Sequence, residues 1–192
     1  MNEIKEFFDR LADGWNAAEK RSPKEIADFI ETYAGLEKGM KTLDVGCGTG
    51  IISEALFNIT KVPVTAIDLS PNMIRIAKDT HDGKNIKFLT EDFYTFGGET
   101  FDAIVCFNAY PHFIDSEKFA EKAAELLTSG GLLVVLHNMS RTKLTRHHDG
   151  VAKRVSRNLL PVEKEAETMK KYFVADRLID DDNVYLMRLR KI

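Results

Sequence analysis

The chain has 192 residues, which is enough for one domain with a sizeable hydrophobic core but hardly for two. Hydrophobic residues make up 44% and charged residues 30%, close to the averages of soluble globular proteins, which excludes disordered and fibrous classes. With 27 basic and 30 acidic side chains the net charge is -3, so nothing general attracts the chain to nucleic-acid backbones or anionic lipid. We therefore expect a single domain over residues 1–192.

The sequence predicts a cytoplasmic protein. The N-terminus lacks a basic region followed by an apolar stretch, and no run approaches the roughly 20 apolar residues that span a bilayer. Cys47 and Cys106 are the only cysteines, and without a secretion signal we expect no disulfide.

Two amphipathic helices are predicted at the N-terminus. Apolar residues recur at helical spacing from Ile4 to Trp15, and again after a helix start at Ser22-Pro23. We interpret residues 1–36 as a helical cap.

From Lys41 onwards, short apolar runs alternate with helical stretches, a pattern that is typical of βαβ units and a parallel sheet. One connecting helix is predicted to begin at Ser70-Pro71, and a later one to end at the Ser-Gly-Gly of residues 129–131. The apolar runs are residues 42–45, 62–67, 86–89, 101–107 and 132–137.

The last third of the chain begins with a polar, basic stretch, residues 140–160, which we interpret as a helical lid or insertion. Pro161 is expected to open a helix that runs to about Phe173. Residues 174–179 and 184–189 then form a closing hairpin around a polar turn. With the five earlier runs this makes an α/β fold: a doubly wound, seven-stranded, mostly parallel sheet with an antiparallel last strand.

The strongest local motif is DVGCGTG, residues 44–50, between the first strand and a helix expected to begin near Thr49. Glycines there let the backbone turn sharply and let a ligand approach closely. The dinucleotide fingerprint G-x-G-x-x-G would need a glycine at position 51, where Ile51 stands.

The carboxylate of Asp44 also argues against a dinucleotide, because it would repel the pyrophosphate at the glycine turn. S-adenosylmethionine (SAM) instead brings an ammonium and a sulfonium, while its carboxylate can meet N–H groups at a helix N-terminus. The alternative is that Asp44 only braces the loop by hydrogen bonds.

From about Lys41 to Arg141 the chain resembles a class I SAM-dependent methyltransferase. After the glycine motif, Asp68 ends the second strand, and Asp92-Phe93 follows the third. The resemblance implies that Asp68 accepts hydrogen bonds from ribose hydroxyls, that Asp92 accepts one from the adenine amino group, and that Phe93 packs on the ring. Otherwise Asp68 would be a helix-start charge and Asp92 a solvated loop residue.

Two further residues, Met73 and Trp15, could contact the cofactor or could instead have a packing role. Met73 could cover the adenine or lie in the core, and Trp15 could close over the cofactor or pack on the sheet. The expected cofactor-binding residues are Trp15, Asp44, Gly46, Cys47, Gly48, Asp68, Leu69, Met73, Asp92, Phe93 and Asn108.

The methyl acceptor is expected at the carboxyl ends of the fourth and fifth strands, where ligands of open α/β sheets bind. His112 and His137 follow these strands and are candidate general bases, because imidazole titrates near neutral pH. Asn108 and Tyr110 would shape the pocket. A histidine at a strand end can equally be structural.

A metal site is a weaker alternative. His137 could meet His147 or His148 of the lid around a transition metal, but no close HxxxH or CxxC spacing supports it. We therefore expect no metal, and a polar surface segment instead.

The sequence thus predicts a SAM-dependent methyltransferase acting on an oxygen, nitrogen or sulfur atom of a small molecule. The Asn-Pro-Pro-Tyr signature for amino-nitrogen acceptors is absent, since residues 108–111 read NAYP, so no nucleic-acid substrate is expected. The basic lid is compatible with an anionic acceptor. The alternatives are a non-catalytic SAM-binding module and a metal-assisted methyltransferase; Ile51 and Asp44 disfavour a nicotinamide-dependent dehydrogenase.

Overall fold

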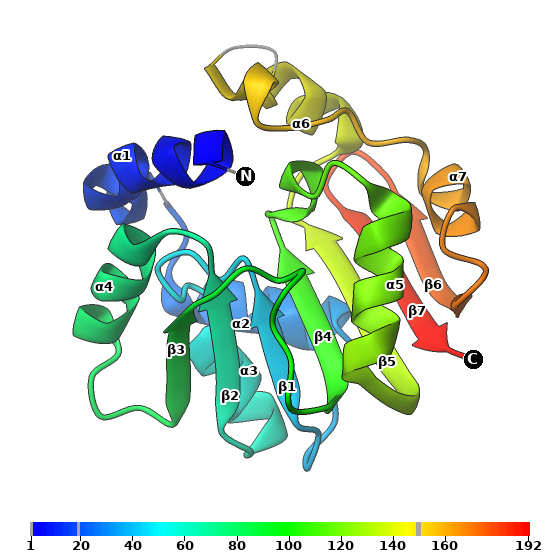
Figure 1. Cartoon of the computed structure of the whole chain (residues 1–192), viewed down its shortest axis with the longest axis horizontal. Helices are drawn as coiled ribbons and strands as arrows, with labels where there is room; N and C mark the ends of the chain where they lie inside the picture. The colour runs from blue at the N-terminus through cyan, green and yellow to red at the C-terminus, as the bar shows by residue number, and fades with distance from the viewer. Residues whose placement is uncertain (1, 19, 149–150) are drawn as a thin grey trace. The chain divides into compact units, whose positions relative to one another are not determined.

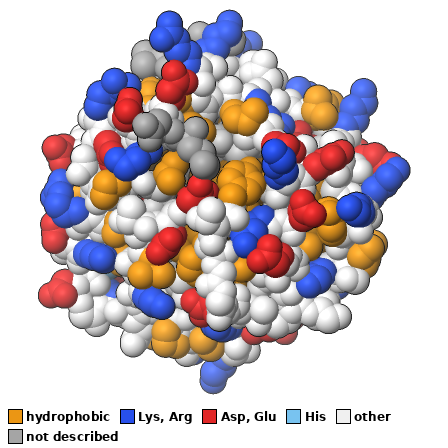
Figure 2. Space-filling model, in the orientation of Figure 1, with side chains coloured by type: hydrophobic (Ala, Val, Ile, Leu, Met, Phe, Trp, Pro, Cys, Tyr) orange, Lys and Arg blue, Asp and Glu red, His pale blue; other side chains and the backbone are white. Residues whose placement is uncertain are grey.

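The computed structural model describes residues 2–18, 20–148 and 151–192, which fold into two compact units (Figure 1). The first unit runs to Phe96 and the second begins at Gly97. Within these described residues, no helix is both long and apolar enough to cross a membrane. Figure 2 shows basic and acidic side chains interspersed over the visible face, rather than gathered into patches of one sign.

In the first unit, three parallel strands lie in the order β3-β2-β1. Leu43 and Val45 of β1 and Ala66 of β2 are completely buried, as expected of parallel strands that are covered by helices. The elements in chain order are α1 (Asn2–Ala18), α2 (Pro23–Tyr33), β1 (Thr42–Val45), α3 (Ser53–Thr60), β2 (Val64–Asp68), α4 (Pro71–Thr80) and β3 (Ile86–Thr90).

In the second unit, the strand order is β4-β5-β7-β6. Strands β4 and β5 are parallel, whereas β7 runs antiparallel to both β5 and β6. The elements are β4 (Phe101–Phe107), the 3-10 helix η1 (Tyr110–His112), α5 (Ser116–Leu126), β5 (Leu127–His137), α6 (Arg141–His148), the 3-10 helix η2 (Val151–Arg154), α7 (Val162–Glu167), β6 (Phe173–Asp180) and β7 (Tyr185–Lys191).

The predicted fold class is confirmed: the described residues form seven strands, mostly parallel, with an antiparallel last strand and two N-terminal helices. Strands β1 and β4 have the predicted bounds. Both predicted helix caps are present, because Ser22 accepts the N–H of Glu25 and Ser70 accepts the N–H of Met73. In the closing hairpin, the Asp181 carboxylate accepts two N–H groups of the polar turn.

The helix after the glycine loop begins at Ser53, not near Thr49 as predicted. Gly50 has a φ of +81°, a left-handed value that an α-helix cannot include. Two turns precede the helix instead, closed by the N–H of Gly50 on the Cys47 carbonyl and the N–H of Ser53 on the Gly50 carbonyl. The glycine motif therefore delays the helix.

Strand β5 and helix α7 differ most from the predicted bounds, whereas strands β2, β3, β6 and β7 differ by one or two residues at their ends. Strand β5 begins at Leu127, before the Ser-Gly-Gly sequence, because Leu127 already pairs with Phe101. The residues between Leu127 and Leu132 form an irregularity in the strand, where Gly130 has a φ of +70°. Helix α7 ends at Glu167 rather than near Phe173, which is the first residue of β6.

Candidate active site

The glycine-rich loop between β1 and α3 is anchored on the end of β2. The N–H groups of Gly46 and Cys47 both donate to the Ile67 carbonyl, at 2.9 and 3.0 Å. The N–H of Gly48 donates to Asp68 Oδ2 at 2.8 Å. Three successive amides of the loop are thus bonded to the last two residues of β2, so β2 sets the shape of the loop.

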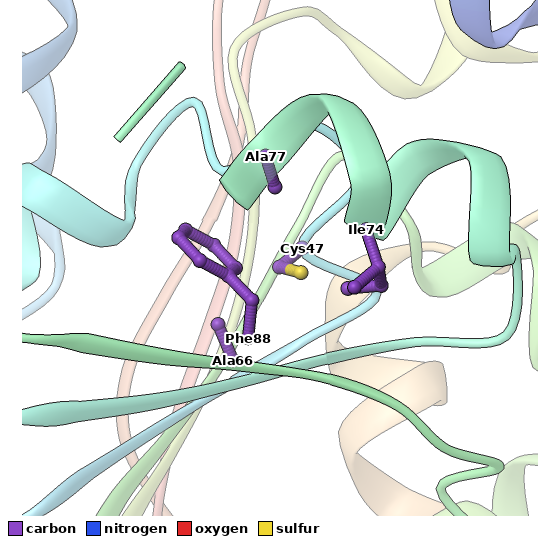
Figure 3. Close-up of a cluster of buried hydrophobic side chains, with 5 residues drawn as sticks. All are labelled: Cys47, Ala66, Ile74, Ala77 and Phe88. Atoms are coloured by element: carbon purple, nitrogen blue, oxygen red, sulfur yellow. The ribbon is translucent and has the colours of Figure 1, made fainter. Parts of the chain in front are cut away.

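The third glycine of the motif is required by packing. A Cβ on Gly50 would lie 2.8 Å from Cζ of Phe88 and 3.0 Å from Cδ2 of His81. The Phe88 ring belongs to the cluster under the loop that Figure 3 shows, which comprises Cys47, Ala66, Ile74, Ala77 and Phe88. The sequence of the loop does not predict that His81 and Phe88 pack against Gly50.

Cys47, which we expected at the cofactor, points its side chain into this cluster and is 5% exposed (Figure 3). Burial raises the pKa of the Cys47 thiol, and the nearby Asp44 and Asp68 carboxyls raise it further. The neutral thiol therefore packs as an apolar group. A role of Cys47 toward a cofactor stays a prediction and would belong to its main chain.

Asp44 lies in β1 and is only 1% exposed. Its Oδ2 accepts a hydrogen bond from the Ser53 hydroxyl, the first residue of α3, at 2.6 Å. Burial raises the pKa of the Asp44 carboxyl to about 7, against the lowering by Ser53, and the charge of Asp68 raises it further. The carboxyl braces the loop to the helix, as the alternative interpretation expected, and it ionises near neutral pH.

Asp68 ends β2 and joins the two loops at the carboxyl end of the unit. Its Oδ2 accepts the N–H of Gly48 and its Oδ1 accepts the N–H of Ser70, both at 2.8 Å. Burial raises the pKa of the Asp68 carboxyl, although these two N–H groups lower it. A carboxylate oxygen can accept more than one hydrogen bond, so these contacts are compatible with the predicted ribose contact.

Helix α1 is tied to both of these loops. Asn16 Oδ1 accepts the hydroxyl of Thr49 in the glycine loop at 2.5 Å. Asp9 Oδ1 accepts the hydroxyl of Ser70 in the loop after β2, also at 2.5 Å. The Trp15 indole nitrogen lies 3.8 Å from the position that a Cβ on Gly48 would take. Trp15 therefore lies at the glycine loop, with 38% of its surface still exposed.

Asp92 and Phe93 follow β3 in a turn that Asp92 itself closes. Its Oδ1 accepts the N–H of Tyr94 at 3.0 Å, and its carbonyl accepts the N–H groups of Thr95 and Phe96. The Phe93 side chain is buried at 4% exposure. The adenine contacts of both residues stay predictions.

Met73 lies in α4 and is 1% exposed, a placement that fits the core alternative. Leu69 follows β2 and is partly buried. Their cofactor contacts also stay predictions.

In the second unit, Asn108 links the carboxyl ends of β4 and β5. Its backbone has a φ of +53°, and its N–H donates to the Leu136 carbonyl at 3.0 Å. Its side-chain amide donates to Asn138 Oδ1 at 3.1 Å, and its own Oδ1 accepts the N–H of Asn138. The residue that was expected at the cofactor thus fixes the two strand ends to each other.

Tyr110 does not line an open surface, because it is completely buried. Its hydroxyl donates to Glu165 Oε1 at 2.8 Å, and the Arg157 guanidinium lies 4.8 Å from its ring centroid. Burial and the Glu165 carboxylate raise the pKa of the Tyr110 hydroxyl, so it remains a donor. Arg157 pairs with the same carboxylate at 2.6 Å.

The two candidate bases have different surroundings. Nδ1 of His112, which is partly buried, lies 2.8 Å from the Val155 carbonyl. His137 is completely buried and packs edge-on against Tyr185, with ring centroids 6.0 Å apart. Both lie in the second unit, and His112 is the one nearer to solvent.

In the stretch expected to be a helical lid, residues 140–160, the structure has helix α6 and the 3-10 helix η2, whereas residues 155–160 are not helical. A role as a lid stays a prediction. Three cations of this stretch are engaged within the second unit: Arg141 with Asp180, Lys143 with the Asp182 carbonyl, and Arg157 with Glu165. Because these three cations already have partners in the protein, they give little support to an anionic acceptor.

The metal alternative gains no support from the described residues, among which no cluster of three or more His, Cys, Asp or Glu side chains could hold an ion. The side chains of His147 and His148 fall outside the described part of the chain.

Several polar residues of these sites were not predicted, among them Asp9, Asn16 and Ser53. Each is an ordinary polar residue of a helix, and only its partner in the fold gives it a role. The sequence likewise does not predict the pairing of Arg157 with Glu165, because the two residues are eight positions apart across an irregular segment.

Comparison with known proteins agrees with this geometry. Residues 43–135 match a family model described as a methyltransferase domain. A ubiquinone biosynthesis O-methyltransferase from Coxiella burnetii is 34% identical over 140 residues, covering 68% of this chain and 59% of the relative. One from Xylella fastidiosa is 37% identical over 113 residues, covering 56% and 45%. The chain thus spans less than two thirds of the length of these relatives.

Solved structures share the fold at low sequence identity. The N-methyltransferase NodS from Bradyrhizobium japonicum, solved with S-adenosyl-L-homocysteine, superposes with a TM-score of 0.73 at 17% identity, covering 98% of both chains. A protein from Pyrococcus horikoshii gives a TM-score of 0.73 at 19% identity, covering 98% of this chain and 99% of that one. The chain thus contains a methyltransferase domain over residues 43–135, in agreement with its predicted resemblance to class I SAM-dependent methyltransferases, and it shares the fold of these solved structures.

Proposed function

We propose that this chain binds SAM in its first unit and transfers the methyl group to a hydroxyl oxygen of a small molecule. The observation that carries the proposal is the pair of acidic side chains, Asp44 and Asp68, at the glycine loop of a methyltransferase domain. The match covers 59% of the Coxiella relative, so we do not carry the acceptor of that enzyme over to this chain.

The acidic pair suits a cationic ligand. Burial raises the pKa of both carboxyls, because it disfavours their ionised forms. A cation beside them favours ionisation, whereas a pyrophosphate would oppose it. SAM carries an ammonium and a sulfonium and no phosphate. Asp68 would hold the ribose hydroxyls, while Asp44, through Ser53, holds the loop and contributes negative charge.

An oxygen acceptor is favoured by the names of the relatives and by the chemistry of His112. A hydroxyl must lose its proton when its oxygen becomes methylated. A carbonyl can only accept a hydrogen bond, so the contact with Val155 requires a proton on His112 Nδ1, and the lone pair of the neutral ring is on Nε2. His137, buried beside Tyr185, is the weaker candidate.

The proposed reaction couples methyl transfer to the removal of one proton from the acceptor. When bound, SAM would supply a methyl group on a positive sulfur, so that a bond from the methyl carbon to the acceptor oxygen would replace its bond to sulfur, whose electron pair would stay on the sulfur. The hydroxyl proton passes to His112 Nε2 and then to solvent. The net charge of -3 and the interspersed charges on the face that Figure 2 shows also favour a small acceptor over a nucleic acid.

The test is a calorimetric titration with SAM and, separately, NADH, followed by turnover assays with phenols and catechols as acceptors. We expect SAM to bind and NADH to be silent, with S-adenosylhomocysteine accumulating in proportion to methylated oxygen. Asp68→Ala should weaken SAM by roughly 1.5–3 kcal/mol, the range for hydrogen bonds to a charged group. The matched control, Asp79→Ala, removes an exposed carboxylate of α4 and should leave SAM affinity unchanged.

Each outcome decides between functions. If SAM binds but no oxygen, nitrogen or sulfur acceptor is methylated, the chain is a non-catalytic SAM-binding module and not an enzyme. Binding of NADH in place of SAM would revive a dehydrogenase. Turnover only with amines or thiols would keep the methyltransferase and reject the oxygen acceptor.

A further inference from the structure

The turn that carries His112 is held by a segment more than 40 positions later in the chain. His112 is the last residue of η1, and its Nδ1 contacts the carbonyl of Val155, which directly follows η2. Val155 is itself 4% exposed, so this carbonyl is fixed in the interior of the second unit. The position of residue 155 therefore decides which ring nitrogen of His112 carries the proton.

Arg157, two residues further on, holds the turn on both sides of His112. Its main-chain N–H donates to the Pro111 carbonyl at 3.0 Å. Its side-chain Nε donates to the Phe113 carbonyl at 3.1 Å. The residue before and the residue after His112 are thus bonded to one arginine, whose guanidinium also covers the Tyr110 ring.

Glu165 in turn fixes Arg157. It is completely buried and accepts two guanidinium N–H groups, at 2.6 and 3.2 Å. It also accepts the Tyr110 hydroxyl at 2.8 Å and the N–H of Leu160 at 3.0 Å. A buried ion pair is a poor way to gain stability, because desolvation offsets much of the attraction, but it fixes geometry when all its hydrogen bonds are made.

We propose that Arg157 and Glu165 are positioning residues, which hold His112 so that Nδ1 is protonated and Nε2 is the basic nitrogen. This inference rests on the proposed function, in which His112 Nε2 takes the proton of the acceptor hydroxyl. The pair acts through three carbonyls: it holds those of Pro111 and Phe113 and, through the chain, places that of Val155. It does not touch the acceptor.

The decisive readout is the tautomer of His112, which nitrogen NMR of histidine-labelled protein measures without any substrate. The His112 signal is assigned by its loss in His112→Gln. We expect the Nδ1–H tautomer in the wild-type protein. Arg157→Lys keeps the positive charge but loses the Nε donor and the two-pronged contact with Glu165. In this variant we expect the Nε2–H tautomer to become populated.

Kinetics provide the second readout. A general base contributes about 100-fold or more to rate, so we expect His112→Gln to lose that much in kcat and Arg157→Lys to lose at least about tenfold. The KM for SAM should not change, because the predicted contacts of SAM are almost all in the first unit. The matched control is Arg188→Lys, which alters an arginine paired with Asp176 across β6 and β7 and should change neither tautomer nor kcat.

Tyr110→Phe is a milder variant, since it removes only the hydroxyl that donates to Glu165. It should shift the tautomer in the same direction and serves if Arg157→Lys does not fold. An Nε2–H tautomer in the wild-type protein would overturn the inference without any variant. So would an unchanged tautomer in a folded Arg157→Lys or Tyr110→Phe protein, while leaving the proposed function intact. Full activity of His112→Gln would show that His112 is not the general base. If the wild-type protein has the Nδ1–H tautomer but methylates no acceptor, the proposed function is wrong.

Discussion

A single buried carboxyl, Asp44, gives the strongest pH dependence that we expect of this protein. Folding takes its side chain out of water and pairs it with a neutral donor, the Ser53 hydroxyl. The protonated form is therefore favoured in the folded state, where its pKa is about 7 against an ordinary value of 3.8. The folded state binds the proton more tightly than the unfolded chain does.

A carboxyl whose pKa rises on folding stabilises the fold most below its unfolded pKa, and this stabilisation is lost as pH rises through the folded pKa. Between pH 5 and pH 8 we expect Asp44 to remove roughly 3 kcal/mol from the free energy of unfolding. Asp44→Asn keeps an acceptor for Ser53 and does not titrate, so its urea midpoint should fall less between these pH values. The exposed Asp79→Asn should follow the wild-type protein; the same slope in all three proteins would contradict the raised pKa.

At the scale of elements, the turn between β1 and α3 depends on a packing contact from β3. Gly50 needs a left-handed φ of +81°, and a Cβ there would lie 2.8 Å from the Phe88 ring. Gly83 offers a matched control, because its φ is +72° but a Cβ there would meet nothing within 4 Å. The two glycines separate the backbone effect from the packing effect.

We expect Gly83→Ala to destabilise the protein by about 1–2 kcal/mol, the cost of a left-handed alanine. Gly50→Ala should cost about 2–5 kcal/mol, since overpacking adds to the same backbone strain. In a double-mutant cycle, Phe88→Leu should reduce the cost of Gly50→Ala by making room for the methyl group. Equal costs at the two glycines, measured by urea unfolding, would show that the Phe88 contact does not govern the turn.

At the scale of the whole molecule, the single-domain prediction means that the two compact units unfold together. The predicted SAM contacts lie in the first unit except for Asn108, whereas the candidate bases lie in the second. Composition and length predict one domain over residues 1–192, and this stays a prediction. A ligand that binds only the folded state raises stability by about 2.7 kcal/mol at 100 times its dissociation constant.

Hydrogen exchange with and without SAM tests this prediction. If the chain unfolds as one domain, the slowest amides of β5 should gain the same protection as those of β1, although the predicted contacts of SAM lie mostly in the first unit. Protection confined to residues up to Phe96 would mean two units that unfold separately. Amides of the β6–β7 turn, around Asp181, should be unaffected in either case, because exposed turns exchange by local opening.

The sequence by itself determined the features that depend on near neighbours in the chain. Alternating apolar runs and helical periodicity predicted the order of strands and helices, since each element buries its own apolar face. Cap chemistry predicted the starts at Pro23 and Pro71, because Ser22 and Ser70 act on amides three residues away. The glycine motif and the acids that follow successive strands predicted the family, which the methyltransferase domain confirms.

Only the tertiary structure decided which polar groups meet. Asp9 lies 61 positions from Ser70, Glu165 lies 55 positions from Tyr110, and Val155 lies 43 positions from His112. The sequence pattern tells which face of a strand or helix is apolar, but not which distant polar group lies opposite once it is buried. A buried polar group must find a partner or lose the free energy of its hydration. The fold therefore selected these pairs, among them the contacts proposed to orient His112, from residues that the sequence left without a role.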